Sequence, residues 1–396
     1  MEDQRNFVRG LYDIAVAAAD PFAAVSRHID KVDPPTLIVA FGKASNNMAK
    51  AAVARFEGTP CLVVTNYENA LSLPNAKVYL AGHPVPNKDG AAAAEAVHAA
   101  VTAANGPILV LISGGGSSLL PAPVGGVTLE DKIALNKMLL SSGLDIVQMN
   151  LIRQQVSRLK GGGLLRAASP NHVTSLILSD VIGDDFSAIA SGPTSPPLGT
   201  VADARAILVT AGLWNVLPTS IQMHLSKDID VLDVPASTNI LVGSNAVSVG
   251  AMAAATPTAT VLPPIEGDVK EAAYRICSMA QPGLTLWGGE TTVLLRGTGQ
   301  GGRNQELSLH IAKEAESRGW DSWCCLQGGS DGRDGPTDAA GGIVDQDTLA
   351  RIAANGGDID KLLANNDSYE ALRKSGDLLV TGGTGTNVAD IGILVR

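Results

Sequence analysis

The sequence predicts a doubly wound α/β protein, in which parallel strands are covered by helices on both faces. Short apolar runs bounded by glycine or proline recur along the chain and are typical of buried strands. Segments with helical periodicity separate these runs, so that strands and helices alternate. Alternation favours parallel sheets, because two parallel strands need a crossover that is usually a helix.

The length predicts two domains, since the chain has 396 residues and a domain takes roughly 150. Hydrophobic residues make up 45% of the chain, which is enough to fill a core in each domain. A polar, proline-containing stretch near residues 228–238 marks the expected seam. We therefore expect two Rossmann-like domains with mainly parallel sheets, one over residues 1–235 and one over 236–396.

Individual elements follow from the same patterns. The expected helices are 87–104, which is nearly all alanine, 128–141, which opens with Thr128 and Asp131, and 268–280, which opens with Asp268 and Glu271. The last two begin with capping residues. The expected strands cover 36–41, 61–65, 77–81, 108–112, 173–178, 240–242, 259–262, 285–287, 291–295, 323–326 and 378–380.

The charge balance excludes some partners. Lys and Arg number 29 against 39 Asp and Glu, and a net charge of −10 disfavours nucleic acid and anionic membranes. No apolar run is long enough to span a membrane, and no secretory signal is visible. The four cysteines have no zinc or CxxC spacing, so we expect reduced thiols in a cytoplasmic protein.

Glycines cluster directly after the expected strands. In an open parallel sheet, the loops after the carboxyl ends of the strands line the ligand crevice. Glycine there lets backbone N–H groups approach a ligand closely, which suits a polyanion. The glycines concerned are Gly42, Gly114–Gly116, Gly183, Gly288–Gly289, 328–332 and 382–385.

Two of these loops are candidate phosphate sites. The segment SGGGSS follows the strand at 108–112 and offers a cradle for a phosphate or carboxylate, although a flexible turn is the alternative. Its residues are Ser113, Gly114, Gly115, Gly116, Ser117 and Ser118. In FGKAS, Lys43 follows another strand, but the segment is no Walker A loop, since Ala44 stands where Ser or Thr should bind magnesium.

The segment GTGQGG at 297–302 fits the dinucleotide pattern GxGxxG. That fingerprint needs an acid at the end of the next strand, whereas Asp321 precedes its expected strand. Arg303 stands at the start of the following helix, where a guanidinium suits a phosphate. We therefore favour phosphate over a dinucleotide.

Two acidic loops are candidates for catalysis or metal binding. Asp331, Asp334 and Asp338 lie on one loop and suit magnesium, with an Asp-Gly turn cluster as the alternative. Asp180 follows the strand at 173–178 and could act as a base for a hydroxyl or as a metal ligand. GGSDG resembles a serine nucleophile elbow, but no histidine follows it, which argues against a hydrolase.

A basic face also precedes a glycine run. Arg153, Ser157 and Lys160 have helical spacing and lead into GGG, which fits a charged wall of the crevice as well as a solvated face. Anion loops, isolated cations and a few acids are the parts that phosphoryl transfer needs. The residues alone thus indicate a small-molecule kinase with no named substrate.

Ten motifs together resemble the glycerate 2-kinases of the MOFRL family. They occur in order from near residue 40 to 390: FGKAS, GHPVPN, SGGGSS, RLKGGG, LSDVIGD, ASGPT, GGETT, GGRNQE, DGPTDAAG and TGTN. The resemblance implies two α/β domains, an N-terminal MOFRL-associated domain and a C-terminal MOFRL domain, with the active site in a cleft between them. It also implies ATP-dependent phosphorylation of D-glycerate at its 2-hydroxyl, giving 2-phosphoglycerate.

The resemblance assigns roles to residues of these motifs. Lys43 and Arg303 are expected on the transferring phosphate, Asp180 as base or metal ligand, and the 113–118 loop on a substrate anion. Magnesium would bridge phosphate oxygens and nearby carboxylates, for which Asp331, Asp334 and Asp338 are the candidates. Further substrate or phosphate contacts are expected from Lys160, Gly192, Thr194, Glu290, Asn304 and Asn387.

The sequence departs from the family pattern at three places: Asn87 replaces Asp, Gly383 replaces Pro and Ala389 replaces Asn. Two other functions are open. An NAD(P)H-dependent hydroxypyruvate reductase is the alternative that GTGQGG would support, whereas the retained acids argue against a non-catalytic nucleotide sensor. D-glycerate and ATP are the expected partners, and a homodimer is an open question.

Overall fold

The computed structural model describes residues 2–227 and 233–396. The chain divides into two compact units, Pro21–Val242 and Gly243–Arg396, and residues up to Asp20 belong to the second. We call them the N-terminal and the C-terminal unit. The expected boundary at 235/236 lies close to this division, but the expected assignment of the first residues differs from it. Residues 228–232 of the expected seam lie outside the described residues.

The N-terminal unit contains a six-stranded sheet with the order β3-β2-β1-β4-β5-β6. Strands β1 to β5 pair in parallel, as the sequence predicted for this part of the chain. This order reverses direction between β1 and β4, which is where ligands bind in doubly wound sheets. The strands are β1 (Leu37–Phe41), β2 (Cys61–Asn66), β3 (Ala76–Ala81), β4 (Ile108–Ile112), β5 (Val173–Leu178) and β6 (Ser237–Gly243).

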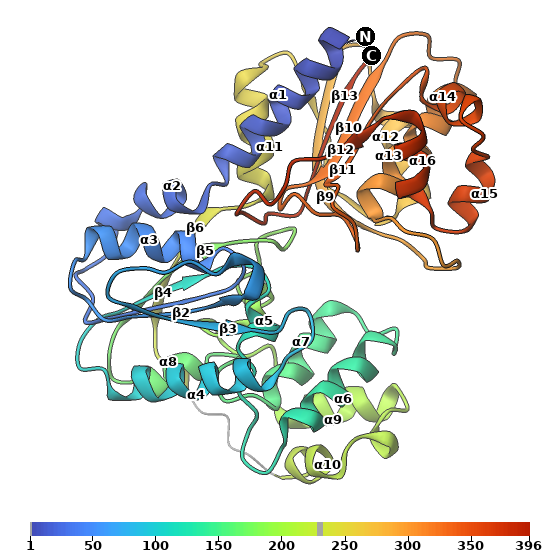
Figure 1. Ribbon diagram of the computed structural model, residues 1–396. Coiled ribbons are helices and arrows are strands. Elements are labelled where there is room, and N and C mark those ends of the chain that lie inside the picture. The colour runs from blue at the N-terminus through green and yellow to red at the C-terminus, as the bar shows by residue number, and fades with distance from the viewer. Residues whose placement is uncertain (1, 228–232) are drawn as a thin grey trace. The chain divides into compact units, whose positions relative to one another are not determined.

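Helices cover both faces of this sheet (Figure 1). Helices α4 and α8 pack on the face that carries Val39, Phe41 and Val110, and α2 and α3 pack on the other. A second core joins α6, α7, α9 and α10 into a helical extension of the same unit. The helices are α2 (Pro21–Ser26), α3 (Ser45–Arg55), α4 (Lys88–Ala103), α5 (Gly116–Leu119), α6 (Leu129–Leu140), α7 (Ile146–Gln155), α8 (Gly163–Ala168), α9 (Val201–Thr210) and α10 (Thr219–Leu225).

The C-terminal unit contains a seven-stranded mixed sheet with the order β12-β11-β10-β13-β9-β7, and β8 also pairs with β9. The expectation of a mainly parallel second sheet is wrong, since β10 pairs antiparallel with both β11 and β13. No helix fills the loop between β10 and β11, so the chain has no crossover there and returns antiparallel. The strands are β7 (Thr260–Val261), β8 (Ile265–Asp268), β9 (Leu284–Thr292), β10 (Cys324–Gly329), β11 (Gly341–Asp345), β12 (Leu378–Leu379) and β13 (Asp390–Val395).

The strands at 285–287 and 291–295 that the sequence predicted are one strand, β9. Gly288 and Gly289 suggested a break, but they serve close packing instead. A Cβ on Gly288 would lie 1.7 Å from Oδ1 of Asn245, and one on Gly289 would lie 1.9 Å from the carbonyl oxygen of Ile265. Strands β8, β11 and β13 were not predicted, because glycines interrupt their apolar pattern.

Capping residues begin the helices where the sequence placed them. Thr128 and Asp131 form a reciprocal capping box at α6, and Asp268 accepts hydrogen bonds at the start of α12. All four cysteines are buried and free, as predicted, and burial raises the pKa of Cys61 and Cys277 to about 12. Within residues 2–227 and 233–396, no helix has both the length and the apolar character of a membrane span.

The first helix completes the core of the C-terminal unit. Helices α1 and α11 cover one face of its sheet, and α12, α13 and α16 lie on the other (Figure 1). Val8, Leu11 and Tyr12 of α1 are buried, and the Tyr12 hydroxyl donates to the Gly329 carbonyl at 2.7 Å. The helices are α1 (Glu2–Ala18), α11 (Asn245–Ala255), α12 (Val269–Met279), α13 (Arg303–Ser317), α14 (Thr348–Ala354), α15 (Ile359–Ala364) and α16 (Ser368–Ser375).

We predict that Leu11→Ala destabilises the C-terminal unit by about 2–4 kcal/mol, because it opens a cavity in this core. Ile14→Ala on the same helix is the control, since Ile14 is 39% exposed, and it should cost well under half as much. Urea unfolding followed by tryptophan fluorescence measures both, because Trp287 and Trp323 are buried in this unit. Equal effects would show that α1 is not part of the core.

Candidate functional site

The loops after β1 and β4 meet at the reversal point of the first sheet. The Lys43 N–H donates to the Gly114 carbonyl at 2.8 Å, and the Ala44 N–H donates to the Ser113 hydroxyl at 3.1 Å. Gly42 has a φ of 124°, and a Cβ there would lie 2.2 Å from the Ser113 hydroxyl oxygen. Only glycine allows the two loops to approach this closely. The loops after β1 and β4 are thus in direct contact.

The three glycines of the SGGGSS loop bring the candidate side chains together. A Cβ on Gly114 would lie 2.0 Å from Oδ2 of Asp180, so this carboxylate rests against the loop backbone. A Cβ on Gly115 would lie 3.0 Å from Cδ2 of His83 and 3.2 Å from Cγ of Lys43. Lys43, His83 and Asp180 therefore surround one short segment, although they come from the ends of three different strands.

A strained segment supports this loop from the side. Its residues Ala190, Ser191 and Gly192 have φ between 51° and 64°, in the left-handed region. This conformation is unfavourable for Ala and Ser but not for Gly. The Ser191 hydroxyl lies 3.1 Å from the hydroxyl of Ser117, and a Cβ on Gly116 would lie 3.0 Å from that of Ala190. The surrounding contacts impose this conformation. Gly192, an expected ligand contact, is buried within this support.

Lys160 is the buried cation of the loop. Its Nζ donates to the Ser117 hydroxyl at 2.6 Å, to the Ser117 carbonyl at 2.9 Å and to the Ala190 carbonyl at 3.5 Å. Only 4% of the residue is exposed. Burial lowers the pKa of Lys160 well below its usual value, and the like charges of Lys132 and Arg153 lower it further.

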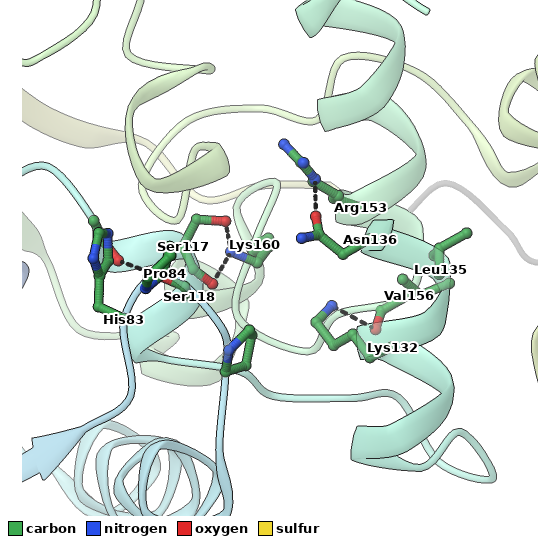
Figure 2. A pocket seen from close by; sticks show the side chains of 12 residues that line it. His83, Pro84, Ser117, Ser118, Lys132, Leu135, Asn136, Arg153, Val156 and Lys160 are labelled. Atoms are coloured by element: carbon green, nitrogen blue, oxygen red, sulfur yellow. Dashed lines mark hydrogen bonds between the residues drawn. The ribbon is translucent and has the colours of Figure 1, made fainter. Parts of the chain in front are cut away.

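A cavity of about 230 Å³ adjoins the loop (Figure 2). Figure 2 shows Lys132, Asn136 and Arg153 on one side and His83, Ser117 and Ser118 on the other. The first group comes from helices α6 and α7 of the helical extension. The remaining lining residues are Pro84, Pro86, Gly115, Leu135, Val156 and Lys160.

The sequence reasoning did not select Lys132 or Asn136, and it gave Arg153 only as part of a basic face. The available signal was that Lys132 shares the buried stripe of α6 with Leu135 and Leu139. A lysine in such a stripe needs a reason to be there. Its Nζ donates to the Val156 carbonyl at 3.3 Å, and burial lowers its pKa from 10.5 to about 7, with the charge of Arg153 as the second cause.

Arg303 of the C-terminal unit is held by a carboxylate. Its Nε and Nη2 donate to Oδ2 and Oδ1 of Asp390 at 2.6 and 3.0 Å, a bidentate pair. Glu290 lies 3.3 Å from Nη1. Burial opposes the charge, but the Asp390 carboxylate and its hydrogen bonds raise the pKa of Arg303 above its ordinary value. Arg303 therefore remains a fixed cation.

Asp334 caps the helix that Arg303 begins. Its Oδ1 and Oδ2 accept from the backbone N–H groups of Asn304 and Gln305 at 3.1 and 2.8 Å. Burial raises the pKa of Asp334 to about 6, although these N–H groups act against the rise. The Asn304 amide is buried and donates to both Asp334 and Asp390. Asn304, an expected phosphate contact, thus orients the two acids around Arg303.

The GTGQGG loop does not form an open phosphate cradle. The N–H groups of Gly297 and Thr298 donate to the side chains of Asn366 and Asn365, and that of Gln300 donates to Asp367. The Gly299 N–H donates to the Asn365 carbonyl. These amides are used within the chain. Phosphate binding by this loop, as the sequence predicted, would have to displace them.

The three acids proposed for magnesium do not form a ligand set. Asp334 caps α13, Asp338 accepts from the Tyr369 hydroxyl at 2.8 Å, and Asp331 accepts from the Arg333 N–H at 3.0 Å. Across residues 2–227 and 233–396, no three His, Cys, Asp or Glu side chains are grouped for a metal ion. The turn-cluster alternative describes this loop better, so we assign no chemistry to a metal held by these side chains.

The remaining candidates lie within the two units as follows. Thr194 is buried, and its carbonyl accepts from Ser237 and Asn239, which attaches β6 to the unit. Glu290 is exposed beside Arg303, and Asn387 is partly exposed in the loop before β13. Gly192 and Thr194 are thus buried and hold other segments in place, whereas Glu290 is exposed to solvent.

Comparisons with known proteins identify the family. A domain of unknown function (DUF4147) matches residues 7–226, and the MOFRL family matches residues 283–390. The chain belongs to the MOFRL family. The resemblance read from the ten motifs is thereby confirmed.

Three proteins with assigned names resemble the chain over nearly its full length. A glycerate 2-kinase from Pyrococcus horikoshii is 35% identical over 96% of this chain and 94% of its own. A D-glycerate 2-kinase from Thermotoga maritima is 37% identical over 96% of each chain. A protein from Agrobacterium vitis that is 40% identical, over 98% of this chain and 93% of its own, is provisionally named a hydroxypyruvate reductase.

Solved structures agree with this assignment. The crystal structure of a glycerate kinase from Thermotoga maritima has a TM-score of 0.90 with 35% identity, and each chain is covered completely. A structure from Pyrococcus horikoshii has a TM-score of 0.81 with 34% identity, over 99% of this chain and 98% of the other. The two-domain α/β class predicted from the sequence is confirmed.

One of the three departures from the family pattern, Asn87, has a local explanation. Asn87 caps α4 by accepting from the Gly90 N–H, and its amide also donates to Tyr67 and Asp89, which an aspartate could not do. Ala389 has a φ of 62°, a left-handed conformation that Asn tolerates better than Ala. Nothing in the structure explains Gly383.

We predict that Lys132→Met stabilises the ligand-free protein at pH 6 by about 1–4 kcal/mol, and that the gain shrinks as the pH rises. The folded-state pKa of about 7 lies below the usual 10.5. Between these values the unfolded chain binds more protons, so the wild type gains stability with rising pH. Urea unfolding of both proteins between pH 6 and about pH 9 measures the difference. A gain independent of pH would contradict the shift.

Proposed function

We propose that the chain is a glycerate 2-kinase, which transfers the γ-phosphoryl group of ATP to the 2-hydroxyl of D-glycerate and releases 2-phosphoglycerate and ADP. The observation that carries this proposal is the convergence of Lys43, Asp180 and the SGGGSS loop at one sheet reversal point. Full-length identity of 35 and 37% to relatives that bear this name supports it.

The N-terminal unit offers groups for both sides of the transfer. Asp180 is proposed to take the proton of the 2-hydroxyl, whose oxygen then bonds to the γ-phosphorus as the bond to the ADP oxygen breaks. Lys43 is proposed to stabilise the charge on the transferring group. Helix α3 begins beside Lys43 without a side-chain cap, so its first N–H groups favour an anion there.

Arg303 is proposed as a second cation for the phosphoryl group. Its bidentate pairing with Asp390 fixes the guanidinium plane, and Asn304 holds Asp390 in turn. A preorganised cation needs no rearrangement during the reaction, which is how fixed charges lower a barrier. Glu290 and Asn387 remain proposed substrate contacts of the same unit. Magnesium is proposed to arrive with ATP, without a protein-borne ligand set.

A hydroxypyruvate reductase is the second candidate, since the Agrobacterium vitis relative carries that provisional name. The strand order of the six-stranded sheet in the N-terminal unit also occurs in dinucleotide-binding sheets. However, the loop after β1 is FGKAS and lacks the glycine fingerprint, and the amides of GTGQGG are bonded to residues 365–367. Neither loop offers the pyrophosphate cradle that a dinucleotide needs, which favours the kinase.

We predict that purified protein converts D-glycerate and ATP into 2-phosphoglycerate in the presence of magnesium. Lys43→Ala should lower kcat by about 10²–10³-fold while the melting temperature stays the same. The measurement is a coupled ADP assay, with the phosphoglycerate isomer identified by NMR. Oxidation of NADH or NADPH with hydroxypyruvate, and no phosphorylation, would instead establish the reductase.

We predict that Gly114→Ala leaves the fold intact but lowers kcat by about 10²–10⁴-fold, as does Asp180→Asn. The added Cβ would meet the end of the Asp180 side chain, which can turn away and so leave its position. The double variant should be no worse than either single one, because both remove the same carboxylate. Gly125→Ala is the control, since a Cβ there meets nothing within 4 Å. Additive losses of kcat in the double variant would show that Gly114 and Asp180 act independently.

A further inference from the structure

Three basic side chains gather at the cavity beside the SGGGSS loop. Lys132, Arg153 and Lys160 line it, and no Asp or Glu is among its lining residues, all of which the structure describes. Within residues 2–227 and 233–396, these three side chains donate hydrogen bonds to neutral partners only: backbone carbonyls, the Ser117 hydroxyl and the amides of Asn136 and Asn150.

Such an arrangement is costly without an anion. Lys132 and Lys160 are 7% and 4% exposed, so water compensates little of their charge. Burial lowers the pKa of both lysines, and the nearby charge of Arg153 lowers the pKa of each of them further. Buried charges in proteins are normally paired, and among the described residues no acidic side chain lines this cavity as a partner. An anionic ligand would supply it.

We propose that this cavity binds an oligophosphate chain, through Lys132, Arg153 and Lys160. Three cations match the several charges of a di- or triphosphate, whereas the single carboxylate of a hydroxy acid would leave two of them uncompensated. The Asn136 amide and the Ser117 and Ser118 hydroxyls at the cavity wall are neutral hydrogen-bonding groups for further phosphate oxygens (Figure 2).

The position of the cavity indicates how the bound oligophosphate would be oriented. Gly115 belongs to the cavity wall and is also the residue against which Lys43 and His83 lie. A phosphate chain held by the three cations would therefore end at Lys43. On the proposed function, the nucleotide is the source of this chain, with its terminal phosphate next to Lys43; free inorganic oligophosphate is the other source of the same chemistry.

Calorimetry on the full-length protein tests the site without turnover. The titrants are ADP, adenosine, inorganic tripolyphosphate and D-glycerate, each with wild type, Lys132→Met and Arg153→Met. Lys137→Met is the matched control, because Lys137 lies on the exposed side of the same helix as Lys132. Melting curves of the ligand-free variants show that each is folded, and Lys132→Met should melt above the wild type near neutral pH.

We expect both cavity variants to lower the affinity for ADP, for tripolyphosphate or for both at least about tenfold. The affinities for adenosine and D-glycerate should change less than twofold. Loss for ADP identifies the nucleotide as a source, and loss for tripolyphosphate alone identifies free oligophosphate. Unchanged affinity for both phosphates in a folded variant overturns the proposal, as does a tenfold loss confined to D-glycerate. A protein that binds ADP this way but forms no 2-phosphoglycerate would refute the proposed function and leave the site standing.

Discussion

The close contact between the loops after β1 and β4 is the constraint on which the N-terminal unit's site depends. The Lys43 N–H is tied to the Gly114 carbonyl, and the Ala44 N–H to the Ser113 hydroxyl, so each loop fixes the backbone of the other. Because β1 and β4 are neighbours at the reversal point, no intervening strand separates the loops. The glycines then leave room for side chains from other strand ends. The site is thus a consequence of strand order before it is one of side-chain chemistry.

In the C-terminal unit, carboxylates rather than glycines hold the candidate residues in place. Asp334 satisfies the first N–H groups of α13, and Asp390 holds the guanidinium of Arg303. Asn304 links the two acids and is itself held by Gln327, which accepts from the buried Trp287 indole. Acids that look like metal ligands in sequence therefore have a structural duty here. The Arg303 side chain remains 35% exposed, with Glu290 3.3 Å from its Nη1.

The sequence predicted the first sheet well because its central strands β1 and β4 are continuous apolar runs, with Gly42 directly after β1 and Gly114 two positions after β4. It also predicted that Lys43, Asp180 and the SGGGSS loop share a site, which follows from parallel strand ends alone. It failed for the second sheet, where Gly341 and Gly342 in β11 mask a strand. It also did not predict that the amides of GTGQGG bond to residues more than sixty positions away. Local patterns carry no information about such distant partners.

Lys132 shows why the missed residues matter most. By pattern it occupies a core position of α6, and an apolar side chain there would pack beside Leu135 and Leu139 at lower electrostatic cost. Its Nζ makes one hydrogen bond, to a backbone carbonyl, and it is placed next to two further cations. Stability alone gives no account of a lysine at this position, whereas an anion in the cavity does. The electrostatic cost of Lys132 in the ligand-free protein and the proposed affinity of the cavity for an anion then have the same physical origin.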